Sequence, residues 1–432
     1  MGGMLDTLRN AWKIKDLRKK ILFTIAMLVV YRLGSFVPNP GVDTSIFSGI
    51  LDSTGSLGGF LNILSGGAFE KATVFALGIQ PYVNSSIIMQ LLAVAIPALE
   101  RLQKEGEEGR KKIQQYVRYG AVILGLVQAV ALYITTQSRG GVIDGGSVWS
   151  FLTITLSFCA GTAFIMWLGE KITENGIGNG ISMIIFASIV SRGPVAAQEL
   201  IGNYKMGNFG SGFLGILAIV GILLVFVVVI AGVIWVQEAE RRIPIQYAKR
   251  VVGRKMYGGQ STYLPIKVNL AGVIPIIFAM SIMMFPSTIV TMFFANKDNW
   301  FVNIFKSPEQ NALYVIIYSL LILFFTFFYS VMQFNPVEIA NNMKKNGGFV
   351  PGYRPGKATS DYITKVLNRI TWFGGFFLAI ITVAPIILGN VTKIPGIWFG
   401  GTSVLILVGV ALDTVKAIES QMLMRHYKGF LE

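Results

Sequence analysis

Long apolar stretches alternate with short polar segments along the whole chain. The hydrocarbon core of a bilayer requires about 20 mostly apolar residues per helix. Ten stretches approach that length, which predicts an all-α membrane protein with ten transmembrane helices. The predicted spans are Ile21–Val37, Thr73–Pro97, Tyr116–Thr136, Val148–Leu168, Ile177–Val190, Phe213–Val236, Val268–Phe294, Ala312–Phe334, Ile370–Leu388 and Thr402–Met424.

The lysines and arginines between these spans are unevenly distributed. The two ends of the chain and every second loop carry 28 of them, and the alternate loops carry 7. Basic residues stay in the cytoplasm when a membrane protein inserts. Both termini are therefore predicted to be cytoplasmic, with residues 1–20 as a basic cytoplasmic segment. Ile21–Val37 has no small-residue cleavage site and is expected to be a span rather than a signal peptide. Met1–Met4 resembles a second start added upstream.

Composition narrows the class of protein further. The chain is 53% hydrophobic and only 14% charged, with a net charge of +15, which excludes an ordinary soluble protein and a disordered one. Cys159 is the single cysteine and His426 the single histidine. They cannot form a disulfide framework, a zinc site or a Cys–His nucleophile pair. We expect no metal, no cofactor and no enzymatic activity.

Two halves of five spans each, 21–200 and 201–432, contain matching irregularities. Gly78-x-x-Pro81 and Gly272-x-x-Pro275 each lie near the start of the second span of a half, and a glycine-rich sequence precedes the fifth span of each half. Five spans per half invert the second half relative to the first. Paired interruptions of this kind favour a central pathway between inverted repeats, although glycine and proline also serve ordinary helix packing in membranes.

Ionisable residues are scarce within the spans. Arg32 and Asp413 are the exceptions, and we expect both to be packed or to extend toward an interface. Near the interruptions the chain offers aliphatic residues, which would seal a pore by dewetting and tight fit. The same residues also suit plain core or lipid-facing packing. These candidate lining residues are Ile79, Val83, Ile181, Ile185, Ile277 and Ile406.

The segment from Leu57 to Ala68 is apolar and flanked by glycine pairs, but it is too short to cross a bilayer. It is predicted to be either a re-entrant half-helix that fills a cavity or an amphipathic helix on the outer surface.

Two predicted cytoplasmic loops, at about 237–267 and 335–369, carry 13 basic residues between them. The first alternates apolar and polar residues on two arms, which predicts a basic hairpin. The second places Arg354 on a turn made rigid by glycines and prolines. The charges favour an acidic partner such as RNA or an acidic protein face, while the positive-inside rule and anionic lipid also account for some of them.

Seven ordered blocks resemble the SecY family of protein-channel subunits, and the resemblance covers essentially all of residues 4–432. The blocks include Tyr31–Gly34 with Val37–Gly41, Phe75–Tyr82, and Trp167–Glu170 followed by Gly176–Ser182. The others are Gly259–Thr262, Val268–Pro275, Val350–Gly356 and Phe399–Ser403.

The resemblance implies a channel that translocates unfolded secretory polypeptides and releases transmembrane segments sideways into lipid. It implies that the six aliphatic residues named above form a pore ring. Leu57–Ala68 would be the plug, with Leu57, Phe60, Leu61, Ile63 and Leu64 as its apolar residues. Val83 is smaller than the isoleucine often found at its position, so the seal would depend more on the plug.

The resemblance also implies partners and a location. SecE and SecG would be separate subunits, and the SecA ATPase or the ribosome would drive transport of substrates with signal sequences. The docking residues would be Arg241, Arg242, Lys249, Arg250, Arg254, Lys255 and Arg354. The protein would reside in the bacterial plasma membrane. A small-solute secondary transporter is the alternative, and it would need an intramembrane ion-binding cluster, which the sequence does not offer.

Overall fold

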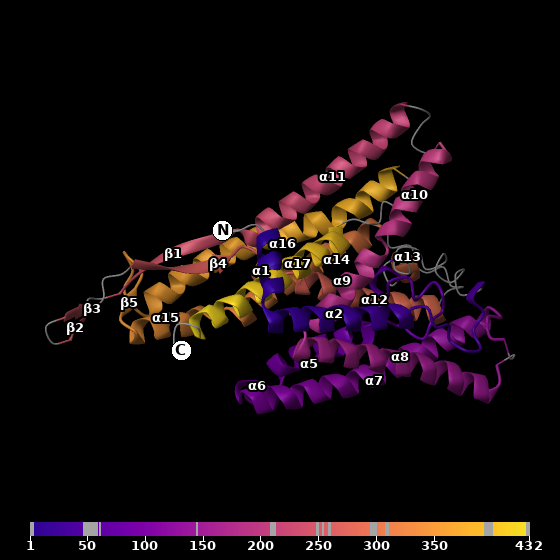
Figure 1. The fold of residues 1–432 in the computed structure, drawn as a ribbon, viewed down its shortest axis with the longest axis horizontal. Helices are drawn as coiled ribbons and strands as arrows, with labels where there is room; N and C mark the ends of the chain where they lie inside the picture. Colours follow the sequence, from indigo (N-terminus) through magenta and orange to yellow (C-terminus); the bar gives the residue numbers. More distant parts are fainter. Residues whose placement is uncertain are drawn as a thin grey trace. The chain divides into compact units, whose positions relative to one another are not determined.

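The chain folds mainly into long helices (Figure 1). Its residues divide into two compact units. The computed structural model describes residues 4–45, 59, 62–143, 146–207, 213–247, 250–252, 255–257, 261–293, 300–306, 311–392 and 401–428. Unit 1 comprises residues 1–208, 284–311 and 406–432. Unit 2 comprises residues 209–283 and 312–405.

Unit 1 contains most of the helices from the first part of the chain. They are α1 (Met4–Lys13), α2 (Lys15–Gly34), α5 (Gln80–Ala95), α6 (Pro97–Lys104), α7 (Glu107–Ser138), α8 (Val148–Asn175), α9 (Gly180–Ser191), α10 (Gly193–Lys205) and α13 (Trp300–Lys306). Two helices have residues in both units. The second part of α12 (Ile274–Phe293) and most of α17 (Gly401–Lys428) belong to unit 1.

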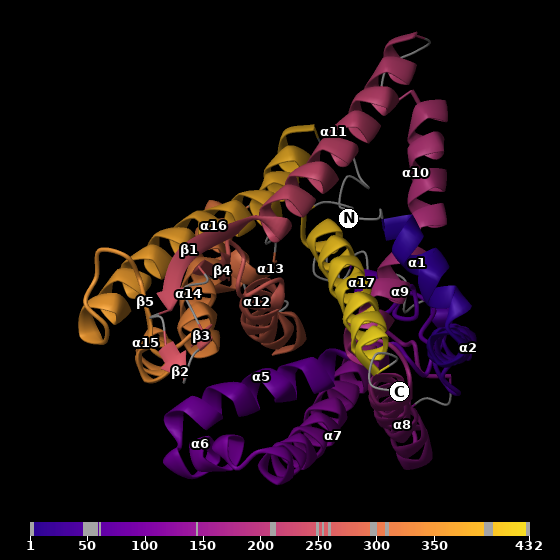
Figure 2. The same cartoon turned by 60° about the vertical axis from the view of Figure 1, so that its left-hand side comes forward.

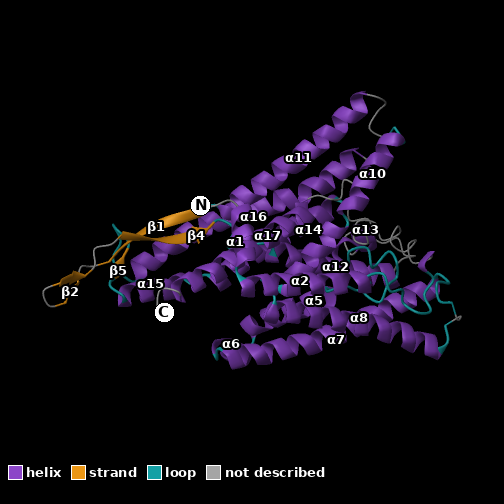
Figure 3. Ribbon diagram, viewed as in Figure 1, coloured by secondary structure: helices purple, strands orange, loops and turns teal. Residues whose placement is uncertain are grey.

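Unit 2 combines helices with two small sheets. Its helices are α11 (Phe213–Glu238), α14 (Ala312–Gln333), α15 (Pro336–Lys345) and α16 (Lys357–Thr392). Its strands are β1 (Glu240–Tyr247), β2 (Arg250–Val252), β3 (Lys255–Tyr257), β4 (Ser261–Lys267) and β5 (Gly348–Phe349), drawn in orange in Figure 3.

Each of the ten predicted spans overlaps a helix, so the prediction of a helical membrane protein is confirmed. In the described part of the chain, seven helical segments are long and apolar enough to cross a bilayer, or eight if α5 and α6 count as one bent span. The most apolar is Gly215–Glu238, with a mean hydropathy of 3.3 and only 6% of its apolar window buried. Such a surface suits lipid. The count of ten spans stays a prediction.

The second predicted span is helical over only part of its length. Residues 73–79 form turns, and the helix begins at Gln80. It ends before Pro97, which has no N–H to donate and holds Ile96 in an extended conformation at φ −110° and ψ 113°. The chain therefore bends by 104° between α5 and α6. In Figure 2, α6 turns back beside the start of α7. The two helices are so close there that a Cβ on Gly109 of α7 would overlap the backbone carbonyl of Leu102.

Several non-helical segments in the described part of unit 1 pair with one another through backbone hydrogen bonds. Isolated bridges join Pro38 with Thr73 and Val42 with Val142. Asn39 N donates to Ala72 O over 2.9 Å. These segments contribute to an apolar core with α7 and α8 that includes Phe69, Ala129, Tyr133, Ile154 and Phe158.

The two ends of the chain meet in unit 1. Ala11, Leu17, Ile177 and Ile418 form one buried cluster. At its edge, Lys20 Nζ donates to Gln421 Oε1 over 3.3 Å, and Thr7 Oγ1 donates to Glu419 Oε1 over 3.1 Å. The amphipathic pattern of the carboxyl-terminal part of α17 suits these contacts. Its apolar side packs on α1 and α2, and its polar residues lie at the edge of that packed surface.

The predicted basic hairpin is confirmed in unit 2. Strand β1 pairs with β4 in antiparallel register from Glu240↔Lys267 to Gln246↔Ser261, and β2 pairs with β3 nearer the tip. One face of the β4–β1–β5 sheet packs on α15 and α16 through a core that includes Ile243, Ile266 and Ile363. The alternation of buried and exposed residues along β1 follows from the two-residue period of a strand.

Helix α8 approaches the turn before α5 so closely that position 161 has no room for a side chain. A Cβ on Gly161 would overlap the backbone carbonyl of Val74. We predict that Gly161→Val lowers the free energy of unfolding by about 1–3 kcal/mol, since overpacking forces the backbone apart. The measurement is the apparent melting temperature in detergent. Gly221→Val in α11 is the control, because nothing lies within 4 Å of its Cβ position; equal melting of the two variants would contradict this packing.

Candidate functional site

The two Gly-x-x-Pro sequences adopt the same local structure. Gly78 and Gly272 have positive φ angles of 57° and 62°. In each case a helix starts two residues later and has proline in its first turn, where a missing N–H costs nothing. The motifs therefore start α5 and α12 rather than interrupting them. This local match supports the predicted repeat of two halves at 21–200 and 201–432, which stays a prediction.

The aliphatic candidates lie directly after these starts. Ile79 is buried at the start of α5, and Val83 follows one turn later, with its N–H donating to Ile79 O over 3.1 Å. Ile277 is half-buried near the start of α12. Ile406 is buried in α17.

Helix α9 carries the other two candidates and begins at a capped glycine turn. Gly178 has a φ of 70°, and the Asn179 side chain accepts hydrogen bonds from Ile181 N and Ser182 N over 3.0 and 3.2 Å. Ile181 lies against α8, since its Cγ1 is 3.0 Å from the Cβ position of Gly169. Ile185 is buried one turn further on.

Five of the six candidates therefore lie in unit 1, while Ile277 lies in unit 2. All are half-buried or buried, and all lie within or at the start of a helix. The pore ring stays a prediction.

The end of the predicted plug is buried in unit 1. Ile63 is buried and Leu64 is half-buried, and both lie in a short helical turn of residues 62–64. The neighbouring Asn62, Ser65 and Ala68 are each at most 2% exposed. This burial favours the re-entrant interpretation over a surface helix. Leu57, Phe60 and Leu61 lie outside the described residues.

The structure describes only some of the candidate docking residues in the hairpin. Arg241 and Arg242 are exposed on β1, where Arg242 lies 3.5 Å from Glu240. Arg250 lies in β2, and Lys255 lies in β3 opposite Val252. Lys249 and Arg254 lie outside the described residues.

Arg354 occupies the rigid turn that the sequence predicts. Gly352 and Gly356 on either side have φ angles of 86° and 107°. Tyr353 N donates to Val350 O over 3.1 Å, and the Thr359 hydroxyl donates to Arg354 O over 2.9 Å. The backbone is thus held while the Arg354 side chain is exposed. Across the part of the chain that the structure describes, no ion pair involves Arg354.

Three basic residues in or beside the loops of unit 1 are paired with nearby glutamates. Lys104 lies 2.6 Å from Glu100 on α6, and Lys171 lies 2.7 Å from Glu174. Arg118 lies 2.6 Å from Glu170, whose side chain is only 11% exposed.

Arg32 has a more specific role than the packed or extended side chain that the sequence predicts. Its Nη1 atom donates to Gly66 O over 2.7 Å and to the Ser191 hydroxyl over 3.2 Å. Sequence reasoning missed its partners and Arg192, which lies 3.2 Å from Glu70. The available signal was the position of both arginines at the end of a span. Asp413, by contrast, is exposed on α17.

Among the described residues, no three His, Cys, Asp or Glu side chains come together in a way that could hold a metal ion.

The class of protein follows from these features: a multi-pass helical membrane protein with buried irregular segments. The SecY family model matches residues 73–415. A protein translocase subunit SecY from Halalkalibacterium halodurans is 45% identical, and the match covers 99% of this chain and 100% of that protein. The chain belongs to the SecY family.

Solved structures show the same fold. A SecY channel whose plug domain is described as stabilising the closed state has a TM-score of 0.60 at 18% identity, covering 94% of this chain and 92% of that one. Sec61 in a canine ribosome–channel complex from the endoplasmic reticulum has a TM-score of 0.58 at 16% identity, with the same coverage.

Asn179 provides a test of how the glycine turn positions α9. We predict that Asn179→Ala costs about 1 kcal/mol locally, so that the amides of Ile181 and Ser182 exchange about fivefold faster with deuterium. Asn179→Ser is the control, because its hydroxyl can accept the same hydrogen bonds. Unchanged exchange in the alanine variant would show that the cap contributes nothing to the start of α9.

Proposed function

We propose that this chain is the pore-forming subunit of a channel that translocates unfolded secretory polypeptides across the plasma membrane. Its match along the whole length of a protein translocase subunit carries the proposal. The related solved structures are protein-conducting channels. Together these favour the channel over a small-solute transporter.

The proposed pathway is lined by Ile79, Val83, Ile181, Ile185, Ile277 and Ile406. Aliphatic side chains form no directed bonds, so they part around an extended chain of any sequence and close behind it. At rest they exclude ions by dewetting. An apolar segment of a substrate leaves sideways into lipid, because leucine, isoleucine, phenylalanine and valine favour the bilayer and charged residues do not.

We assign the plug to Leu57–Ala68. The buried end of this segment in unit 1 supports the assignment. In a related SecY channel the plug domain is described as stabilising the closed state and maintaining a membrane seal. Here the plug compensates for the small side chain of Val83 in the ring.

The work of transport comes from outside the chain, in this proposal from the SecA ATPase or from elongation at the ribosome. The exposed arginines of β1 and the exposed Arg354 support docking of such a partner. A related channel is ribosome-bound. SecE and SecG are separate subunits of the assembly. The protein resides in a bacterial plasma membrane, with both termini in the cytoplasm.

Crosslinking tests the pathway directly. Photoreactive side chains at positions 79 and 277 are expected to form adducts with a stalled secretory chain, because that chain must pass the ring. Position 224 in α11 is the control, since Leu224 is exposed on an apolar helix surface. Adducts at 224 alone, or none at 79 and 277, would reject a polypeptide pathway.

Arg354→Glu tests the docking turn. We expect SecA-driven transport into vesicles to fall about tenfold or more, because the reversal places a repelling charge opposite an acidic partner. Insertion of the variant into the membrane should be unaffected, since the side chain is exposed. Lys365→Glu serves as the control, because it reverses an exposed charge later in the chain, within α16. Equal loss in both variants would mean that only the overall charge of the loop matters.

A further inference from the structure

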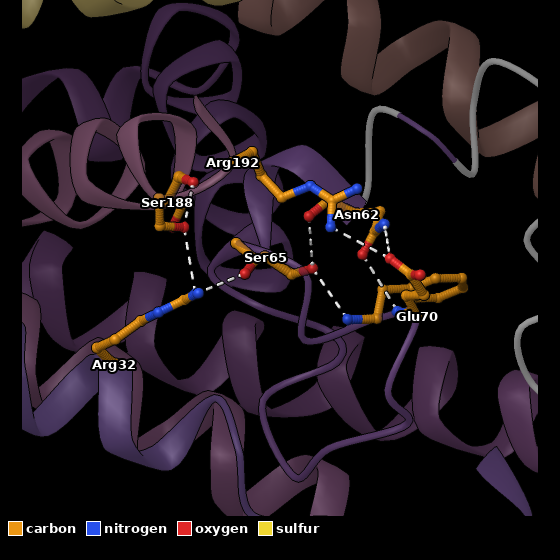
Figure 4. A network of polar contacts seen from close by, with 9 residues as sticks. Arg32, Asn62, Ser65, Glu70, Ser188 and Arg192 are labelled. Carbon is orange, nitrogen blue, oxygen red and sulfur yellow. Dashed lines mark hydrogen bonds and ion pairs between the residues drawn. The ribbon is translucent and has the colours of Figure 1, made fainter. Parts of the chain in front are cut away.

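Two arginines from different parts of the chain contact the same buried turn, residues 62–70, which contains the end of the predicted plug (Figure 4). Arg32 lies near the end of α2 and donates to Gly66 O. Arg192 lies between α9 and α10, and its Nη1 atom is 3.2 Å from Glu70 Oε2. Both contacts lie within unit 1.

The turn between Asn62 and Glu70 is closed by its own hydrogen bonds. Gly67 N donates to Asn62 O over 2.7 Å, and Phe69 N donates to the Ser65 hydroxyl over 3.1 Å. The ends are joined reciprocally, because Asn62 Nδ2 donates to Glu70 Oε2 over 2.9 Å and Glu70 N donates to Asn62 Oδ1 over 3.2 Å. The turn can therefore be held or released as one piece.

Glycines allow the arginines to approach. Gly66 and Gly67 have φ angles of 66° and 87°, which disfavour any side chain. A Cβ on Gly66 would lie 3.3 Å from Arg32 Nη1, and one on Gly67 would lie 3.2 Å from Arg192 Nη1. Because neither glycine carries a side chain, both guanidinium groups can approach the backbone of the turn.

Tyr31, the neighbour of Arg32 on α2, also contacts the turn of residues 62–70. Its hydroxyl donates to Ser65 O over 3.2 Å and lies 2.8 Å from the Ser188 hydroxyl of α9. The Arg32 guanidinium also bonds Ser191 on α9. The turn is thus held by α2 and α9 together.

The contacts are polar and incompletely satisfied. The buried Nε atom of Arg192 has no hydrogen-bond partner, and a buried donor without a partner costs free energy. Such contacts are directional and are lost within a small displacement. An apolar interface would instead tolerate sliding.

We propose that Arg32 and Arg192 are positioning residues that clamp residues 62–70 to α2 and α9 and so hold the plug in its sealing position. This inference rests on the plug role proposed above. Because residues 62–68 of the predicted plug lie within the clamped turn, movement of the plug during opening requires breaking these contacts. The clamp sets the probability that the resting channel is open.

The test measures resting ion conductance of the full channel complex in planar bilayers. Arg192→Gln is expected to raise it about tenfold, since one charged hydrogen bond is lost, and Glu70→Gln is expected to raise it similarly. Glu70 is partly exposed, so its substitution leaves folding intact even if the arginine variant fails to fold. Restoration by Glu70→Arg combined with Arg192→Glu would identify the ion pair itself.

Lys205→Gln is the matched control, because it removes an exposed charge at the end of α10, more than three helical turns beyond Arg192. Deletion of residues 57–68 separates the two proposals. If the deletion raises conductance while Arg192→Gln, Arg32→Gln and Glu70→Gln do not, the clamp is wrong and the plug role stands. If the deletion itself leaves conductance unchanged, the plug role fails and the clamp has no function in sealing.

Discussion

Every backbone N–H and C=O group that lies away from water must find a partner within the chain, and this constraint organises the structure. Helices satisfy it internally. Where the described part of unit 1 leaves the helical conformation near residues 37–43, 72–74 and 141–143, backbone groups pair with other irregular backbone. Asp43 N donates to Gly141 O over 2.9 Å, Ile143 N to Gly41 O over 3.1 Å, and Val74 N to Val37 O over 3.0 Å. Irregular chain at membrane depth is tolerated only under such conditions.

The same constraint explains where charged side chains lie within the apolar interior of unit 1. Arg32 lies in a predicted span, and its guanidinium satisfies a carbonyl group of the Gly66 turn that no helix could satisfy. Glu170 is nearly buried and is paired with Arg118. These charged groups are thus paired within the fold, whereas the proposed lining residues are all aliphatic.

Much of the local structure was predictable because the signals are short-range. The alternation in residues 240–267 predicted a hairpin, and the glycines around Arg354 predicted its turn; both were confirmed. The start of α5 was placed too early, since hydropathy counts Val74 and Phe75 as apolar whether they are helical or in a buried turn. Only Gly78 and Pro81 mark the true start of that helix.

The sequence by itself determined membrane residence, most spans and the SecY family, because apolar length, charge and ordered motifs are properties of the chain read in order. Only the tertiary structure decided that α17 divides between the two units and that Arg32 and Arg192 contact the turn of residues 62–70. Hydropathy reports which residues avoid water, but not which side chains meet. Arg32 bonds residues 34 and 159 positions away, and folding alone brings those residues together.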